Sequence, residues 1–408
     1  MDTVRFGELY AIPSGNGLSR PSAVRGEGYR MIGMGELFAS DIISDTEMDR
    51  VQMSERELKT FLVEEGDLLF ARQSLVAEGA GKCSIVKRLS EPTTYESHLI
   101  RVRLDQKKCN PWFYYYLFKL PNNPIKAIVN QCAQAGIRGN ELIKVKVPLL
   151  DRPIQDRITS ILSVYDNLIE VNNKRIKVLE QMAENLYKEW FVRFRFPGHE
   201  SVPFENGLPT SWRKARITDF VSFLNGFAFK SEDYDDAGRY IVATIKNVQD
   251  GYFDLSNVER IDFLPTRMPQ YCMLKKGDVI MSLTGNVGRV CIVSSDGCLL
   301  NQRVCKIESK YPLFAYLFFR QEAVFQTLCN IAYGTAQLNL SPILTGRMRT
   351  VLPPEHLMAC FDEKVSALYE QIQSYREQSE ILIKQRDLLL PRLMSGRMEV
   401  NLEEQVNE

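Results

Sequence analysis

Two long stretches of the chain carry apolar residues at the spacing of a helix with a seven-residue repeat. In residues 151–196 two neighbouring rows have this spacing: Ile158, Tyr165, Asn172, Leu179 and Leu186, and Leu162, Ile169, Ile176, Ala183 and Trp190. A stripe that persists over more than three heptads, with charges on the other faces, is typical of a coiled coil. We therefore predict one long helix over residues 151–196, roughly 50 Å in length at about 1.5 Å per residue.

The same pattern returns over residues 351–398. Its rows are Val365, Ile372, Ser379 and Arg386, and Leu368, Tyr375, Leu382 and Leu389. Polar residues in such a seam, here Asn172, Ser379 and Arg386, can fix register and partner. Two ordinary amphipathic helices are the alternative, but we predict a coiled coil with this seam: Ile158, Leu162, Tyr165, Ile169, Asn172, Ile176, Leu179, Leu186, Val365, Leu368, Ile372, Tyr375, Leu382 and Leu389.

The stretches before and between these helices have the pattern of mixed, strand-rich domains. Short apolar runs such as Asp67–Ala71 and Cys83–Val86 are separated by Gly, Ser and Asn. An aromatic helix is predicted over Pro111–Lys119, because Asn110-Pro111 is a typical helix start. Its aromatic side chains could stack on bases, but such a stripe more often belongs to a core, and we expect a core role.

The two mixed domains repeat each other. Gly66-Asp67 matches Gly277-Asp278, and Gly28 matches Gly238. Further matches are Gly81–Val86 with Gly288–Val293, the aromatic helix with Tyr311–Phe319, and Val147-Pro148 with Val351-Leu-Pro-Pro354. The repeating unit is therefore one domain plus one long helix, present twice.

This connectivity predicts the architecture. The first helix runs from domain one to domain two, so a second helix that pairs with it must run back, antiparallel. We predict an α+β fold with two similar mixed α/β domains, separated by two long antiparallel coiled-coil helices and related by approximate two-fold symmetry. The segments are 1–150, a mixed domain; 151–196, a spacer helix; 197–350, a second mixed domain; 351–398, a second spacer helix; and 399–408, an acidic tail.

Composition narrows the class of protein. The formal net charge of zero argues against a globally basic DNA binder but allows local basic surfaces. The longest apolar runs are too short to span a bilayer, and the N-terminus lacks the features of a signal peptide. The nine cysteines include no CxxC pair, so we expect reduced thiols, no metal site and a cytoplasmic protein without membrane contact.

Five motifs follow one another along the chain: Tyr187–Val192, Leu208-Pro-Thr-Ser-Trp212, Gly277–Gly288, Leu300-Asn-Gln-Arg303 and Leu389-Leu-Pro-Arg-Leu-Met-Ser-Gly396. With these motifs in this order, the chain resembles the specificity subunits of Type I restriction–modification systems. The first domain has Ala71-Arg-Gln-Ser74 where the second has Ser282-Leu-Thr-Gly285. Such divergence is expected if the domains read different sequences.

The resemblance implies a role for each part. Each mixed domain would be a target recognition domain that reads one half of a bipartite target in double-stranded DNA. The helices would set the spacing and dock two methylation subunits, which carry S-adenosylmethionine and methylate adenine. Restriction subunits, with Mg and ATP, would cut unmodified DNA, and this chain would hold no cofactor and catalyse nothing.

Candidate DNA contacts are the polar and cationic residues on loops beside the repeated glycines. Arg suits guanine edges, Asn and Gln suit adenine, and Lys suits phosphate. The candidates are Arg72, Gln73, Ser74, Lys82, Arg138 and Asn140 in the first domain, and Lys246, Asn247, Thr284, Asn286, Arg289, Asn301, Gln302, Arg303, Gln337 and Asn339 in the second.

No catalytic set emerges from the sequence. It contains no Gly-x-x-x-x-Gly-Lys-Ser/Thr loop. Gly285-Asn-Val-Gly288 is predicted to be a turn between strands, and His98, His199 and His356 are isolated. Two alternatives remain open: a coiled-coil scaffold with two ligand-binding modules and no DNA role, and a nuclease or methylase with an unrecognised site.

Overall fold

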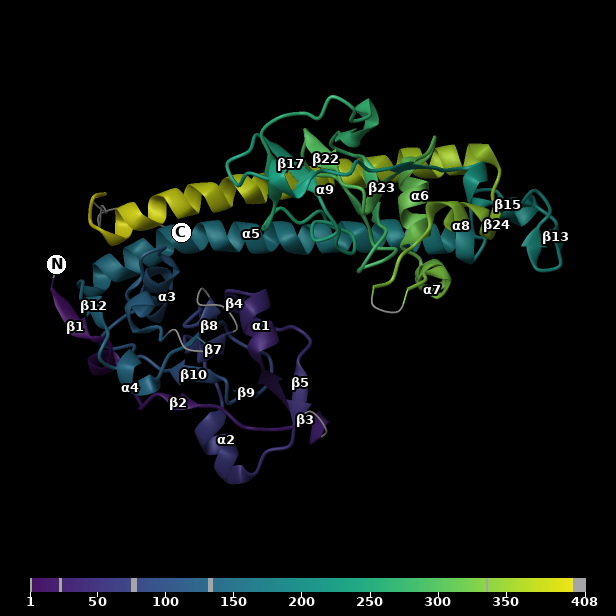
Figure 1. Ribbon diagram of the computed structural model, residues 1–408. Coiled ribbons are helices and arrows are strands. Elements are labelled where there is room, and N and C mark those ends of the chain that lie inside the picture. Colours follow the sequence, from purple (N-terminus) through teal and green to yellow (C-terminus); the bar gives the residue numbers. More distant parts are fainter. Residues whose placement is uncertain (1, 22–23, 75–78, 131–134, 335–336, 399–408) are drawn as a thin grey trace, which may run out of the picture. The chain divides into compact units, whose positions relative to one another are not determined.

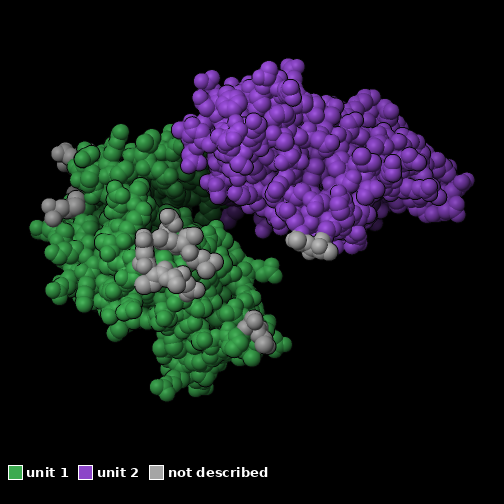
Figure 2. Space-filling view, in the orientation of Figure 1, with its two compact units in different colours: residues 1–170, 379–408 green, residues 171–378 purple. Residues whose placement is uncertain are grey.

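The computed structural model describes residues 2–21, 24–74, 79–130, 135–334 and 337–398, so the predicted acidic tail at 399–408 lies outside the described residues. The chain forms two compact units, which Figure 2 colours separately. Unit 1 combines residues 1–170 with 379–408, and unit 2 is residues 171–378. Each unit therefore contains a part of each long helix.

The two predicted long helices are α5, Arg152–Tyr187, and α9, Glu355–Met394 (Figure 1). The prediction that the first helix reaches residue 196 is wrong. A π-helical turn, Lys188–Val192, follows α5, and Phe194 then has a left-handed φ of 58° that stops the helix. The Phe194 ring packs edge-on against Trp212 at 5.0 Å, which turns the chain back into unit 2.

The long helices pair antiparallel within each unit. In unit 2, the Phe361 ring lies 4.9 Å from the Phe191 ring, and further along α9 Arg376 Nη2 donates to Glu180 Oε1 at 2.8 Å. The contacts between the helices therefore move to higher residue numbers on α9 as they move to lower residue numbers on α5. In unit 1, Arg386 pairs with Asp166, and further along α9 Leu390 and Leu393 share a core with Ile158 and Leu162, which precede Asp166 on α5. The antiparallel prediction is confirmed inside each unit, and every residue of the predicted seam is buried or partly buried.

The described part of unit 1 contains two small sheets and two two-stranded ribbons, one of which pairs β7 with β11. The larger sheet has the order β2-β10-β6-β8-β4, the smaller sheet β5-β3-β9, and β1 pairs with β12 just before α5. The strands and helices are β1 Thr3–Arg5, β2 Gly15–Asn16, β3 Arg25–Ile32, α1 Met34–Ala39, β4 Ile42–Ile43, β5 Asp49–Val51, α2 Glu55–Phe61, β6 Leu68–Ala71, β7 Gln73–Ser74, β8 Cys83–Val86, β9 Thr93–Tyr95, β10 Leu99–Val102, α3 Pro111–Lys119, β11 Ala135–Gly136, α4 Gly139–Leu142 and β12 Lys146–Pro148.

Unit 2 has sheets of order β16-β23-β20-β21 and β18-β17-β22-β19, and β15 pairs with β24 just before α9. Its elements are β13 Phe204–Glu205, β14 Leu208–Pro209, β15 Arg213–Arg216, β16 Ser222–Asn225, β17 Tyr240–Ala243, β18 Glu259–Ile261, β19 Met273–Leu274, β20 Val279–Ser282, β21 Val290–Ile292, β22 Cys298–Leu300, β23 Val304–Glu308, α6 Pro312–Phe319, α7 Glu322–Ile331, α8 Pro342–Arg347 and β24 Arg349–Leu352.

The predicted repeat is a repeat of topology. The order β2-β10-β6-β8 corresponds to β16-β23-β20-β21, and β5-β3-β9 corresponds to β18-β17-β22. The repeated Gly-Asp pairs form the same turn. Gly66 and Gly277 both have positive φ, and Asp67 and Asp278 each accept a hydrogen bond from the backbone N–H three residues earlier. The predicted turn at Gly285–Gly288 is also confirmed, because it joins the antiparallel strands β20 and β21.

The aromatic helices α3 and α6 lie in the cores, as predicted. Phe113 and Tyr114 of α3 and Tyr316 and Phe319 of α6 have no exposed surface. A side chain of a long helix accepts hydrogen bonds from the backbone at the start of each aromatic helix. Gln155 of α5 accepts a hydrogen bond from the N–H of Asn110, the residue that precedes α3. In unit 2, Asp362 of α9 accepts from the N–H groups of Leu313 and Phe314 in α6.

Candidate nucleic-acid interface

Three loops of unit 2 meet along one line of backbone hydrogen bonds, which we call edge 2: residues 283–286, 301–303 and 337–340. Leu283 N donates to Arg303 O at 2.9 Å, and Leu340 N donates to Leu283 O at 2.7 Å. Thr284 forms a β-bridge with Asn339. Edge 2 therefore brings together the predicted contacts Thr284, Asn286, Asn301, Gln302, Arg303, Gln337 and Asn339.

Unit 1 has the same arrangement, which we call edge 1: residues 72–74, 96–98 and 135–137. Arg72 N donates to His98 O at 2.8 Å, and Ile137 N donates to Arg72 O at 3.0 Å. Gln73 pairs with Gly136 in the β7–β11 ladder. Edge 1 contains the predicted contacts Arg72, Gln73 and Ser74, and Arg138 follows it directly.

Sequence reasoning missed residues 96–98 as the counterpart of 301–303. The side chains differ, Glu-Ser-His against Asn-Gln-Arg, so no motif links them. The shared signal is position, because each triplet immediately precedes a buried strand, β10 or β23. His98 is exposed, like Arg303, whereas Glu96 is buried and accepts a hydrogen bond from Met34 N at 2.6 Å.

A glycine that the sequence did not single out supports each edge. Leu18 N donates to Tyr95 O at 2.8 Å, and Phe227 N donates to Leu300 O at 2.9 Å. Gly17, which precedes Leu18, and Gly226, which precedes Phe227, each lie against the backbone of the neighbouring edge. A Cβ on Gly17 would be 1.9 Å from Tyr95 O, and one on Gly226 would be 2.0 Å from Asn301 O. Only glycine fits at either position without a shift of the neighbouring edge.

The candidate contacts differ in how far they reach solvent. Two are buried, Asn247 and Asn301. The exposed ones are Arg138, Asn140, Lys246, Asn286, Gln302, Arg303 and Gln337, and the partly buried ones are Arg72, Gln73, Ser74, Lys82, Thr284, Arg289 and Asn339. The exposed group has the best access to a bound macromolecule.

Several candidates already have partners inside the fold. The Asn247 amide is fully used, because its oxygen accepts from the N–H and hydroxyl of Thr244 and its nitrogen donates to Asp254 O and Asn257 O. Arg289 Nη1 donates to Gln249 Oε1 at 2.9 Å. These contacts give Asn247 and Arg289 structural roles that do not require DNA.

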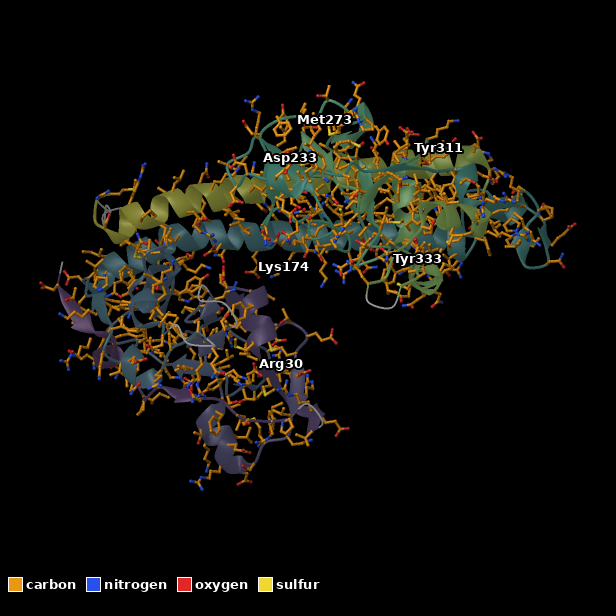
Figure 3. The ribbon with its side chains drawn as sticks, viewed as in Figure 1. Arg30, Lys174, Asp233, Met273, Tyr311 and Tyr333 are labelled. Carbon is orange, nitrogen blue, oxygen red and sulfur yellow. The ribbon has the colours of Figure 1, made fainter. Side chains whose placement is uncertain are left out.

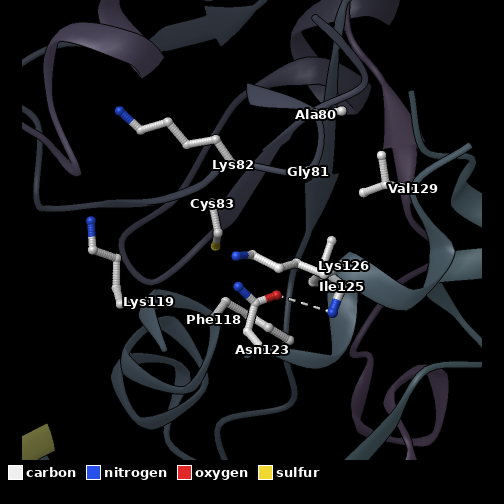
Figure 4. A pocket seen from close by; sticks show the side chains of 10 residues that line it. All are labelled: Ala80, Gly81, Lys82, Cys83, Phe118, Lys119, Asn123, Ile125, Lys126 and Val129. Atoms are coloured by element: carbon white, nitrogen blue, oxygen red, sulfur yellow. Dashed lines mark hydrogen bonds between the residues drawn. The ribbon is translucent and has the colours of Figure 1, made fainter. Parts of the chain in front are cut away.

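Lys82 lies beside a cavity of about 350 Å³ whose lining also includes Lys119, Lys126 and the buried Cys83 (Figure 4). Asp41 forms ion pairs with both Lys82 and Lys119. Burial opposes the ionisation of Asp41, but Lys119 and Lys82 outweigh it and hold its pKa below the ordinary value. The charge of Lys82 is thus partly compensated before any ligand arrives.

Among the described residues, every cysteine is free, and no three His, Cys, Asp or Glu side chains are grouped to hold a metal ion. Burial raises the pKa of the Cys305 thiol to about 12 and that of Cys298 to about 11, so both stay protonated at neutral pH. Within the same part of the chain, no helix has the length and apolar character needed to cross a membrane.

Comparisons with known proteins identify the family. The family model "Type I restriction modification DNA specificity domain" matches residues 2–181 and 209–344. The chain belongs to this family of DNA sequence-recognition proteins, and the predicted resemblance is confirmed. It is 26% identical over 310 residues to the Type I restriction enzyme MjaIX specificity subunit of Methanocaldococcus jannaschii, covering 71% of this chain and 69% of that protein. The MjaVIII specificity subunit of the same organism is 23% identical, with 84% and 81% covered.

A solved structure shows the same fold. The crystal structure of a Type I restriction-modification system S subunit from M. genitalium aligns with a TM-score of 0.54 at 14% identity, covering 96% of this chain and 95% of that chain. The predicted α+β class with two similar recognition domains is therefore confirmed.

Proposed function

We propose that unit 1 and unit 2 each read one half of a bipartite DNA target, through edge 1 and edge 2. The observation that carries this proposal is the repetition of one backbone frame with different side chains. Arg72, Gln73 and His98 in edge 1 stand where edge 2 has Leu283, Thr284 and Arg303. A common frame with different hydrogen-bonding groups suits two readers of unlike sequences.

The long helices would set the spacing between the half-sites and dock two methylation subunits. An exposed face of α5 supports docking. Val171, Val178 and Met182 share one side of the helix at spacings of seven and four residues and are 40%, 58% and 51% exposed. Exposed apolar side chains in such a row are typical of protein–protein contacts.

Catalysis would belong to the partners. In this proposal the methylation subunits bind S-adenosylmethionine and methylate adenine, and restriction subunits use Mg and ATP to cut unmodified DNA. The chain would bind none of these cofactors. Purified by itself it should transfer no methyl group to DNA, and steady S-adenosylmethionine turnover by the isolated chain would contradict the proposal.

Domain replacement tests the half-site assignment. Residues 197–350 are exchanged for the matching segment of a relative, and the chain is expressed with its methylation subunit. Methylome sequencing should then show one half of the motif changed and the other retained. Exchange of residues 1–150 is the matched control and should change the opposite half. A change in both halves from either exchange, or duplex binding that does not depend on salt, would contradict the assignment.

A further inference from the structure

Tyr333, which is labelled in Figure 3, lies two residues after the end of α7. A pair of backbone hydrogen bonds joins it to edge 2. Tyr333 N donates to Asn339 O at 3.0 Å, and Asn339 N donates to Tyr333 O at 2.7 Å. Asn339 in turn bridges Thr284. The backbone of Tyr333 is therefore held at a defined position beside the residues predicted to contact DNA.

The side chain of Tyr333 points to solvent although its backbone is held. It is 59% exposed, and its neighbour Leu338 is 42% exposed. Among the described residues, neither the ring nor the hydroxyl of Tyr333 has a hydrogen-bond, ion-pair or ring partner. Such a ring adds little to the core of unit 2 and offers both an apolar face and a hydrogen-bonding hydroxyl to a ligand.

The repeat gives Tyr333 a counterpart in unit 1. Asn130 N donates to Gly136 O at 2.9 Å, and Gly136 N donates to Asn130 O at 3.2 Å. Gly136 pairs with Gln73, as Asn339 pairs with Thr284. Positions 130 and 333 thus occupy the same place in the two frames, but one carries an amide and the other an aromatic ring.

Resting on the proposed function, we propose that Tyr333 is a further specificity-determining residue for the half-site read by unit 2. Its ring would pack against a base, most simply a thymine methyl group or an unstacked step, and its hydroxyl would hydrogen-bond to a base edge. Asn130 in the first half-site has no aromatic ring to pack against a base, and its amide presents a different hydrogen-bonding pattern from a hydroxyl, so the two positions select different bases.

The test compares Tyr333→Ala, Tyr333→Phe and Asn130→Ala with the parent chain. Each is co-expressed with the methylation subunit in cells that lack other adenine methylation, and the methylome is sequenced. Tyr333→Ala should relax one position in a single half of the motif and leave the other half intact. Asn130→Ala is the matched control because it alters the same hairpin position in unit 1, and it must leave the half that depends on Tyr333 unchanged.

Binding measurements complete the test. The purified complex with methylation subunits is titrated with a duplex carrying the parent motif and with duplexes substituted at the relaxed position. Tyr333→Ala should lower affinity for the parent motif by about 5- to 150-fold and abolish discrimination at that position. Tyr333→Phe should retain packing, so only the discrimination that depends on the hydroxyl should fall. Unfolding midpoints should match the parent, because the side chain is exposed.

The outcomes separate the two proposals. If the parent shows a bipartite motif but Tyr333→Ala keeps that motif with an affinity within about two-fold, the assignment of Tyr333 is wrong and the proposed function stands. A uniform loss of affinity for all duplexes would indicate a phosphate contact and would also overturn the assignment. If the parent shows no bipartite motif, the proposed function fails and the role of Tyr333 fails with it.

Discussion

Arg386 of α9 and Asp166 of α5 form an ion pair of 2.6 Å within unit 1. The hydroxyl of Tyr116 in α3 donates to the other oxygen of Asp166, also at 2.6 Å. Burial opposes the charge on Arg386, but hydrogen bonding to Asp166 outweighs it and raises the pKa of the guanidinium. One carboxylate thus joins three helices that are far apart in the sequence.

Removal of this arginine should destabilise unit 1. Arg386→Leu removes the cation that pairs with Asp166, whose side chain is only 7% exposed, and breaking a buried pair in this way costs about 3–5 kcal/mol. Hydrogen exchange of the α3 amides would measure the loss. Lys230→Ala is the control, because Lys230 and Glu232 form a pair in which both side chains are 74% exposed, worth less than about 1 kcal/mol. Equal effects would contradict the prediction.

Acid should weaken the start of α2. The backbone N–H of Ser54 and the Arg20 guanidinium bond to Glu57 at 2.9 and 2.6 Å and lower its pKa to about 2. Because this pKa lies below the unfolded value of about 4.3, the stabilisation is present at neutral pH. It is lost progressively as the pH falls from about 4.3 to about 2.

The variant Glu57→Gln tests this prediction, because it should lose that part of the acid dependence of hydrogen exchange in α2. Glu55→Gln changes an exposed residue of the same helix and serves as the control. The same acid profile in Glu57→Gln and the parent would refute the assignment.

Gly17→Ala should disturb edge 1. The new Cβ would lie 1.9 Å from Tyr95 O, and such overpacking costs about 1–3 kcal/mol. We expect a lower unfolding midpoint and a change confined to the half of the motif read by unit 1. Gly35→Ala is the matched control, since its Cβ meets no heavy atom within 4 Å and alanine favours a helix by about 0.5–1 kcal/mol. If both variants behave alike, the close approach does not shape the edge.

Arg303 and Arg289 should differ in their effect on DNA binding. Arg303 is exposed on edge 2, whereas Arg289 bonds to Gln249 within the fold. Arg303→Ala should cost about 1–3 kcal/mol with relaxed specificity if it contacts a base, or lower the salt slope by about one unit if it contacts phosphate. Arg289→Ala should change both the free energy of DNA binding and the salt slope less than Arg303→Ala does. Titrations of target duplex at several salt concentrations distinguish these results.

The spacing role of α5 and α9 is testable by insertion. One added heptad near Lys177 and one near Lys384 keep the seam in register and add about 10 Å of helix. That length equals about three base pairs and turns the second half-site by about 100°. The methylated motif should therefore gain about three spacer pairs, or tight binding should be lost. A single insertion should be worse because it slips the seam. An unchanged spacer with full activity in the double insertion would show that the helices do not measure DNA.

Periodic and local features could be predicted from the sequence. The heptad rows predicted both long helices, and the Gly66-Asp67 and Gly277-Asp278 pairs predicted the repeat. The end of α5 could not be predicted, because it depends on Phe194 meeting Trp212. The edges were found only in part. His98 and Tyr333 are placed by backbone bonds between distant loops, and such bonds leave no pattern in the side chains.

The division of the chain has a consequence for its synthesis. Unit 2 is one unbroken segment, residues 171–378, and can close as soon as that segment leaves the ribosome. Unit 1 cannot, because Leu390, Leu393 and Met394 belong to the same core as Phe6 and Phe70. The domain made first is therefore finished last, and until the final turns of α9 emerge its apolar face stays open to chaperones and to misassembly.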